Sequence, residues 1–170
     1  MGYVRDTHMT QYIPPTLMHP KTGTWTHAAG AVAGTIANHK AATDETAIVT
    51  IPMLIPSNSG SLKGSQLVSV EIDFEFLIEA MDAMDAVINK VTRGADGAVA
   101  AVDALAFTYD AGHDTAAERV DVDQHKMTLT LDDPLWIDNE VEILVELTID
   151  AGVNGTIDML GAFANYVFQA

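Results

Sequence analysis

The alternation of apolar and polar positions along this chain predicts β-strands. The clearest case covers residues 66–79, where one face is apolar and the other is polar or acidic. The apolar face carries Val68, Val70, Ile72, Phe74, Phe76 and Ile78. The opposite face carries Ser69, Glu71, Asp73 and Glu75. Apolar residues at strict period two are typical of a strand that buries one face.

The same pattern recurs along the chain in shorter or less regular form. It predicts strands at residues 25–27, 46–54, 84–92, 105–109, 120–131, 141–150 and 156–168. Turn-forming residues lie between them, and the Asp-Asp-Pro of residues 132–134 is expected to end one strand. The Ala- and Met-rich residues 77–89 leave a helix open as an alternative. About eight strands separated by such turns predict an all-β fold, an antiparallel β-sandwich of the jelly-roll kind.

Residues 1–45 are expected to form an extended N-terminal arm and loop region, and residues 46–170 the sandwich domain. Pro14, Pro15 and Pro20 exclude a helix from the arm. The arm also carries apolar side chains that need a surface to lie on. We therefore expect it to cross to a neighbouring subunit.

The C-terminal strand is apolar on both of its faces. One face carries Ile157, Met159, Phe163 and Val167, and the other carries Leu160, Ala162, Ala164, Tyr166 and Phe168. Such a strand must be covered on both sides, and a second subunit can supply one cover. This predicts a homo-oligomer, with a trimer favoured. The expected interface residues are Tyr12, Ile13, Leu17, Met18, Leu160, Tyr166 and Phe168.

Charge is distributed unevenly. Residues 1–70 hold four basic and three acidic residues, a net of +1, and residues 71–170 hold four basic and twenty-one acidic residues, a net of −17; together these give −16. A chain this acidic lacks the cations that nucleic acid and anionic membranes need, so both are excluded as partners. There are no cysteines, hence no disulfides or thiolate sites. No signal peptide or membrane-length apolar run is recognised, so we expect cytoplasmic synthesis followed by incorporation into a virion or extracellular assembly.

Two acidic segments could hold a metal ion. Asp121, Asp123 and His125 share one face if residues 120–131 are a strand, and a solvated acidic face is the favoured interpretation. Asp110 and Asp114 flank Gly112 in a loop that resembles a calcium loop but lacks its ligand order, and a simple turn is favoured. His8, His19, His27 and His39 show no metal-ligand spacing. We therefore predict no cofactor and keep calcium as the alternative.

No catalytic signature is present. There is no G-x-S-x-G or nucleotide-binding motif, and a cupin-like metal site would have only His113 and His125 to draw on in the body of the chain. We predict a non-enzymatic protein. A carbohydrate- or surface-binding sandwich module is the alternative, although Trp25 and Trp136 are the only tryptophans available as sugar platforms.

Four stretches carry a resemblance to a known class of proteins. They are KGSQLVSVEIDFEFLIEAMDAMDAVINKV, LAFTYDAGHDTAAERVDVDQHKMTLTL, ELTIDAG and TIDMLGAFANYVF. In layout they resemble small β-sandwich virion proteins of tailed phages and related environmental sequences. The resemblance implies a self-assembling structural protein of the capsid-decoration, head or fibre type, often a trimer. Its partners would be copies of itself and a capsid or fibre lattice.

Overall fold

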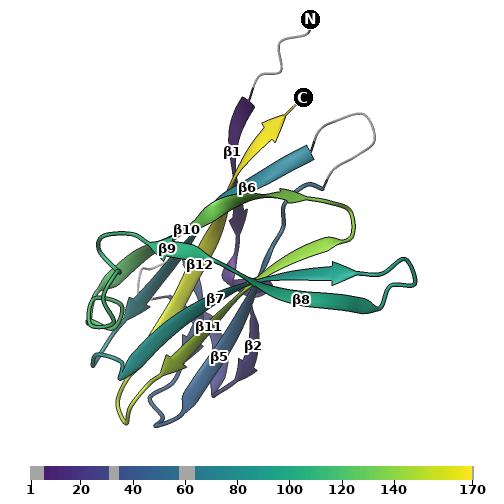
Figure 1. Ribbon diagram of the computed structural model, residues 1–170. Coiled ribbons are helices and arrows are strands. Elements are labelled where there is room, and N and C mark those ends of the chain that lie inside the picture. The colour runs from purple at the N-terminus through teal and green to yellow at the C-terminus, as the bar shows by residue number, and fades with distance from the viewer. Residues whose placement is uncertain (1–5, 31–34, 58–63, 170) are drawn as a thin grey trace, which may run out of the picture.

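The computed structural model describes residues 6–30, 35–57 and 64–169, which form two antiparallel sheets packed face to face (Figure 1). The first sheet holds, in order, β3 (Trp25–Ala29), β4 (Ile36–Lys40), β12 (Ile157–Gln169), β6 (Gly64–Phe76), β10 (Gln124–Ile137) and β9 (Phe107–Tyr109), and β1 (Asp6–Ile13) also pairs with β12. The second sheet holds β2 (His19–Thr22), β5 (Thr46–Met53), β11 (Val141–Asp150), β7 (Ala83–Arg93) and β8 (Val99–Leu105). A short 3₁₀ turn, Pro15–Leu17, joins β1 to β2.

Eight of these strands form a jelly roll. In chain order these strands are β4, β5, β6, β7, β8, β10, β11 and β12, and each lies in the other sheet from the one before it, except that β7 and β8 are neighbours in the second sheet. The last strand, β12, lies between the first, β4, and the third, β6. This is the arrangement of two interlocked Greek keys. The predicted all-β sandwich is confirmed, and the strands of the described residues that the sequence pattern did not predict are β1, β2, β4 and β8.

The core lies between the sheets and follows the predicted alternation from Val70 to Phe76. Val68 and Ile78, predicted on the same buried face, lie outside the core, because the pairing of β6 with β12 shifts between Leu67 and Ser69 and β6 ends at Phe76. In β6 the side chains of Val70, Ile72, Phe74 and Phe76 are buried, whereas those between them are partly exposed. In β11 of the opposite sheet, alternate side chains are likewise buried: Ile143, Val145, Leu147 and Ile149. These two strands therefore supply facing layers of one apolar cluster.

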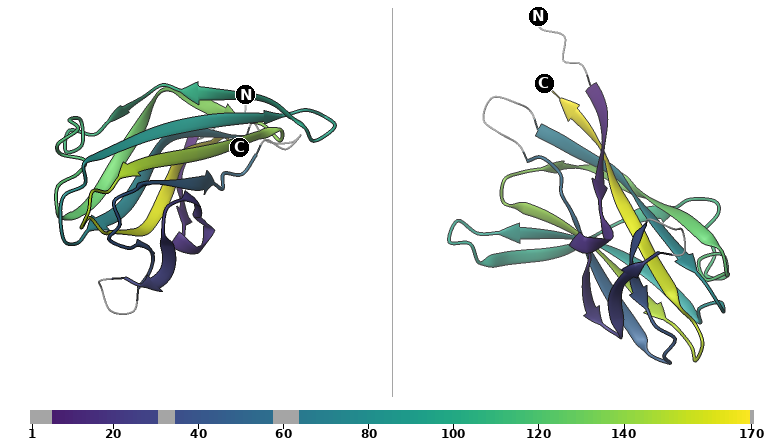
Figure 2. Two further views of the ribbon diagram at one scale, coloured as in Figure 1. Left: turned by 90° about the horizontal axis from the view of Figure 1, so that it is seen from below. Right: turned by 180° about the vertical axis from the view of Figure 1, so that it is seen from behind.

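The N-terminal segment is part of the sandwich, since β1 to β4 lie in its two sheets, although the sequence pattern placed residues 1–45 in an arm and loop region outside it. β1 pairs along the second half of β12, β2 pairs with β5 in the other sheet, and the N-terminal strands lie beside β12 in the view from behind (Figure 2). Ile13 and Met18, predicted to contact another subunit, are buried in the chain's own core. The prolines exclude a helix but suit a turn between sheets and an edge strand, where no N–H is required.

A β-bulge accounts for the doubly apolar C-terminal strand. The register of β12 against β6 shifts between Met159 and Gly161, so inward-facing positions are odd before the shift and even after it. Met159 and Ala162 therefore both face the core. Gly161 has φ +154°, and a Cβ there would lie 2.6 Å from Cε2 of Tyr12, so the bulge requires glycine. The core face of β12 needs no cover from a second subunit.

Two local expectations are corrected as well. Residues 132–134 do not end a strand; they form an irregularity inside β10, where the pairing with β6 shifts between Thr130 and Leu135. The alternative helix over residues 77–89 is not formed, because β7 begins at Ala83 and pairs along its length with β11. No helix in the described part of the chain is long and apolar enough to cross a membrane.

Ile13 and Leu17 provide a matched test of the N-terminal segment. Ile13 is 0% exposed and Leu17 is 39% exposed, although the sequence placed both at a subunit interface. Ile13→Ala should lower the free energy of unfolding by about 2–5 kcal/mol, because it leaves a cavity in the core. Leu17→Ala should change it by no more than about 0.5 kcal/mol. Urea unfolding of both variants measures this; equal effects would contradict the assignment of β1 to the core.

Candidate functional site

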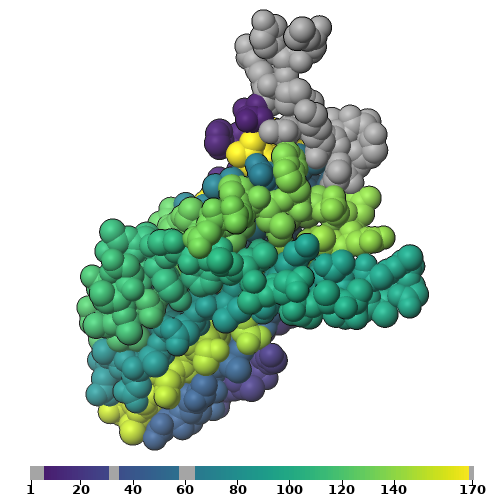
Figure 3. Space-filling model, viewed as in Figure 1, coloured from purple at the N-terminus to yellow at the C-terminus, as the bar shows by residue number. Residues whose placement is uncertain are grey.

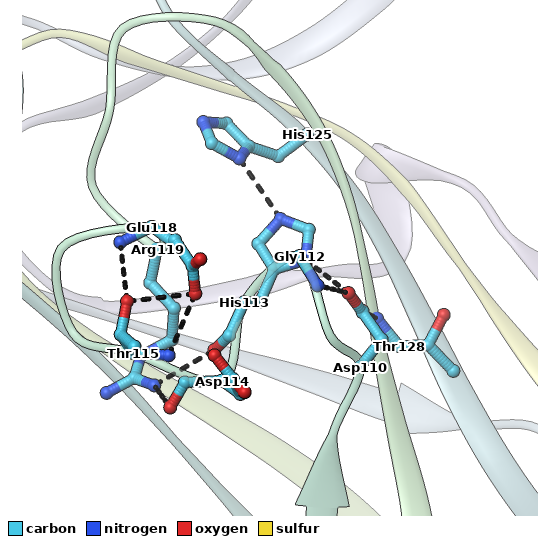
Figure 4. A network of polar contacts seen from close by, with 9 residues as sticks. All are labelled: Asp110, Gly112, His113, Asp114, Thr115, Glu118, Arg119, His125 and Thr128. Atoms are coloured by element: carbon cyan, nitrogen blue, oxygen red, sulfur yellow. Dashed lines mark hydrogen bonds and ion pairs between the residues drawn. The ribbon is translucent and has the colours of Figure 1, made fainter.

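The loop between β9 and β10, residues 110–123, brings together Asp110, His113 and His125 (Figure 4). Nδ1 of His113 lies 2.9 Å from Oδ1 of Asp110, and its Nε2 lies 3.1 Å from Nδ1 of His125. Nε2 of His125 lies 2.8 Å from the backbone carbonyl oxygen of Asp121. The result is a continuous chain of hydrogen bonds from a carboxylate through two imidazoles to a carbonyl.

Asp110 anchors this chain. Its Oδ1 also accepts the backbone N–H of Gly112 at 2.9 Å, and its Oδ2 accepts the backbone N–H of Thr128 in β10. Burial acts to raise the pKa of the Asp110 carboxyl, but the hydrogen bonds from Thr128, His113 and Gly112 together hold it below its ordinary value. Asp110 is therefore an ionised acceptor that fixes the loop to the edge of the first sheet.

Both imidazoles are buried against aromatic rings of β6. The His125 ring stacks on Phe74, with centroids 4.8 Å apart and planes 10° from parallel, and meets Phe76 edge-on at 5.4 Å. His113 is buried beside them. Since each ring nitrogen already has a partner, the pair is held by packing and by hydrogen bonds from within the chain.

Arg119 ties the same loop to the second sheet. Its Nε donates to the carbonyl oxygen of Met84 in β7, and its Nη1 donates to that of His113, both at 3.0 Å. The guanidinium lies 4.4 Å from the ring centroid of Tyr109, whose hydroxyl accepts the N–H of Ala86 at 3.1 Å. The loop thus fastens β9 and β10 of one sheet to β7 of the other.

The residues considered for metal binding gather around this loop. A hollow of about 260 Å³ is lined by His113, Asp121, Asp123 and His125 among others, while Asp114 is exposed. Asp121 and Asp123 precede β10 and so do not share a strand face with His125. Within the described residues, no group of three or more His, Asp or Glu side chains is arranged to hold a metal ion.

The β7–β8 hairpin carries a different kind of site. It projects beyond the sandwich at the right of Figure 1 and stands out in the space-filling view (Figure 3). All residues of β8 except Leu105 are exposed; Val99 and Val102 are 56% and 59% exposed. β8 ends its sheet, and no strand in the described ranges pairs with its outer edge. Sequence reasoning missed β8 because its apolar residues do not alternate with polar ones.

The hairpin is also nearly neutral. Residues 83–105 hold two basic and three acidic side chains, a net of −1 in a chain of −16. Lys90 of β7 lies opposite Asp103 of β8 in the strand register. Arg93 pairs with Glu142 of β11, with Nη2 to Oε2 at 2.6 Å. The strongly acidic character of the chain therefore lies outside this hairpin.

The predicted interface residues are divided among several environments. Tyr166 is buried, as are Ile13 and Met18, and Phe168 and Leu160 are partly buried. Tyr12 and Leu17 remain exposed. They therefore do not form one continuous exposed patch.

Tyr12 lies on the outer face of the first sheet. Its ring packs against Phe163 of β12 with centroids 5.0 Å apart, and its hydroxyl donates to the carbonyl oxygen of Leu160 at 3.2 Å. Burial, and next the charge of Asp73, raise the pKa of the Tyr12 hydroxyl. Glu71 accepts hydrogen bonds on the same face from Asn165 at 3.0 Å and lies 2.6 Å from Nζ of Lys126. Two aromatic rings thus lie beside several polar groups.

No family model matches the chain, and no curated protein matches it in sequence. The resemblance to phage virion proteins is therefore not supported by a match to any family model.

The similar solved structures are β-rich domains of low sequence identity. The CBM22-1 xylan-binding domain of Paenibacillus barcinonensis Xyn10C is 8% identical over 92% of both chains, with a TM-score of 0.45. The MgGH51 α-L-arabinofuranosidase is 10% identical, with a TM-score of 0.42. The match covers 91% of this chain but only 24% of the enzyme's chain. Bacteriophage CBA120 tailspike protein 4 is 7% identical with a TM-score of 0.39, over 93% of this chain and 19% of the other.

Asp110 and Asp121 provide a matched test of the loop. Asp110→Asn should lower the free energy of unfolding at neutral pH by about 1.5–3 kcal/mol, because charge-assisted hydrogen bonds are lost. Asp121→Asn should have little effect, since His125 uses the backbone carbonyl of Asp121 and its side chain is exposed. Chemical denaturation of both variants measures this difference.

The pH dependence of the Asp110 effect has a definite sign. The pKa of Asp110 is lower in the folded chain than in the unfolded chain, so its contribution is fully present above the ordinary carboxyl value of about 3.9. This contribution to stability is lost as pH falls through the lower pKa that Asp110 has in the folded chain. A difference between wild type and Asp110→Asn that grew as pH fell below about 4 would contradict this account.

Proposed function

We propose that this chain is a non-enzymatic structural module that self-associates through the outer edge of β8. The observation that carries the proposal is a seven-residue edge strand that is almost wholly exposed and has one charged residue, Asp103. An exposed apolar strand edge presents unpaired backbone N–H and C=O groups, which another strand can satisfy.

The other sheet edges are less suited to pairing. β2 is only four residues long and carries Pro20 and Lys21, which block further pairing, and β9 has only three residues. β3 has five residues, one of which is His27, and is shorter than β8. β8 lacks a proline or a lysine and is longer than β2, β3 and β9. β1, which pairs only with β12, is one residue longer than β8, but most of its side chains are polar, whereas those of β8 are apolar except for Asp103.

A second copy of the same chain is the partner that fits this edge. Antiparallel pairing of β8 with its copy, centred on Val102, would join two five-stranded sheets across a two-fold axis. Asp103 would then face Ala101 of the second copy, and no two like charges would be directly opposite. Since the hairpin has little net charge, two acidic chains meet there with the least repulsion. Such pairing gives a dimer, whereas the phage-protein resemblance suggested a trimer.

The wider setting of this assembly follows from the sequence resemblance. We propose a virion or other extracellular lattice, of the decoration, head or fibre type, as the place where such dimers act. The jelly-roll architecture is compatible with that role.

Val102 and Val153 provide a matched test of the β8 edge. Val102→Lys should convert a dimer of 18.2 kDa chains into a monomer, because it places like charges at the two-fold axis. Val153→Lys should leave the dimer intact, since Val153 is 68% exposed in the loop after β11. Light scattering after size-exclusion chromatography gives the masses. A wild-type monomer at all concentrations, or a Val102→Lys dimer, would overturn the proposal.

Ionic strength distinguishes an apolar edge contact from an ionic one. Added monovalent salt should strengthen association, because it screens the repulsion between chains of net charge −16. Dissociation of the wild-type dimer in salt would instead show that ion pairs hold it together.

A carbohydrate-binding role is the second candidate. It is favoured by the neighbouring rings of Tyr12 and Phe163 on the outer face of the first sheet, beside Glu71 and Asn165. Aromatic faces with adjacent hydrogen-bonding groups suit sugar rings.

Tyr12 and Trp136 provide the test of this second candidate. Calorimetric titration with soluble xylo-oligosaccharides should show binding that Tyr12→Ala abolishes and Trp136→Ala preserves, because exposed Trp136 lies on β10, remote in the sheet order from β1. No binding by folded wild-type protein across a panel of oligosaccharides would remove this candidate.

A further inference from the structure

The hydrogen-bond chain from Asp110 to Asp121 requires one more proton than two neutral histidines carry. The carboxylate of Asp110 and the carbonyl of Asp121 can only accept, so the ring nitrogen facing each of them must be an N–H. The contact between His113 and His125 needs one N–H between its two nitrogens. The three hydrogen bonds along this path thus use three N–H protons, whereas two neutral imidazoles provide two.

We propose that His113 and His125 form a buried imidazole–imidazolium pair that holds one extra proton over a wide pH range and makes the 110–123 loop a pH-dependent clamp between the two sheets. Asp110 is the counter-ion of the pair. Because hydrogen bonds from Thr128 and Gly112 hold the pKa of Asp110 below its ordinary value, the extra proton resides on the imidazoles. This inference does not depend on self-association through β8.

The pair also resists a second extra proton. Four N–H groups would place two hydrogens between the nitrogens of His113 and His125, which are 3.1 Å apart, and would put two cations in a buried site. Stacking of His125 on Phe74 would be lost if the ring turned away from this contact. The folded pair therefore carries one extra proton at both mildly acidic and mildly alkaline pH.

Other charged groups surround the histidine pair, but their ordinary pKa values lie outside the range between about pH 5 and pH 9. The loop contributes Asp114, Glu118, Arg119, Asp121 and Asp123; β10 contributes Lys126, β6 contributes Glu75 opposite Gln124, and β7 contributes Asp85 next to Arg119. Carboxylates ordinarily titrate near pH 4, although a hydrogen bond with Glu118 and its charge raise the pKa of Asp114, and Lys and Arg titrate above about pH 10. Only the histidines change their protonation between about pH 5 and pH 9.

The sign of the stability effect follows from counting protons. Two unfolded histidines carry two extra protons well below about pH 6.5 and none well above it, whereas the folded pair carries one. Below that pH the unfolded chain binds more protons, so stability rises with pH. Above it the folded chain binds more protons, so stability falls with pH. The contribution is therefore greatest near about pH 6.5 and changes the unfolding equilibrium constant by up to about tenfold per pH unit on either side.

The direct experiment is a count of ring N–H protons. In the full chain labelled with ¹⁵N, imidazole spectra at about pH 8, where ordinary histidines are neutral, should show three N–H groups for His113 and His125 together. Two N–H groups, one on each ring, would overturn the proposal. This measurement needs only the wild-type protein and so does not depend on whether a variant folds.

A pair of double variants tests the consequence for stability. Denaturant unfolding of the wild type and of His113→Gln/His125→Gln should differ by an amount that follows a bell-shaped curve between about pH 5 and pH 9. The control His19→Gln/His27→Gln removes two exposed histidines and should give a flat difference. A flat difference for the His113/His125 variant as well, or one that changes steadily in one direction with pH, would contradict the clamp.

Discussion

The pairing of β12 with its neighbours is the interaction on which the rest of the structure depends. β12 gives one edge to β6 and shares the other between β4 and β1, so three strands from distant parts of the sequence are aligned by it. The bulge at Gly161 lets both halves of β12 bury side chains in the same core. The chain therefore completes its first sheet only when its last residues meet its first.

The two sheets are then joined at their ends by polar contacts in addition to the apolar core. Asp110, the histidine pair and Arg119 connect the loop after β9 to β10 and β7, and every polar contact of the imidazoles is made within the chain. In contrast, the β7–β8 hairpin extends past the opposing sheet and leaves an apolar edge uncovered. The molecule thus has one end at which the polar groups of the loop are hydrogen-bonded within the chain, and one exposed strand edge, β8, with which a strand of a second chain can pair.

Sequence reasoning predicted what depends on local alternation and missed what depends on long-range contacts. The strands of β6 and β11 and the jelly-roll architecture follow from period-two patterns that the structure confirms. The bulge at Gly161 reverses the period within one strand, so the apolar residues of β12 were read as two faces. Ile13 was assigned to another subunit because its partners lie about 150 residues away in sequence. The pairing of His113 with His125 was missed for a different reason: the two residues are only 12 apart in sequence, but they meet through the irregular loop before β10, which has no periodic pattern.

Hydrogen exchange measured over a range of protein concentrations tests most directly whether β1 is integral to the sandwich and β8 is its associating edge. The account predicts that the amides of β12, and those amides of β1 that face β12, are protected at every concentration, because both strands belong to the first sheet. It also predicts that the outward amides of β8 exchange fast in dilute protein and become protected as concentration rises. Fast exchange throughout β1, or exchange in β8 that does not change with concentration, would contradict it.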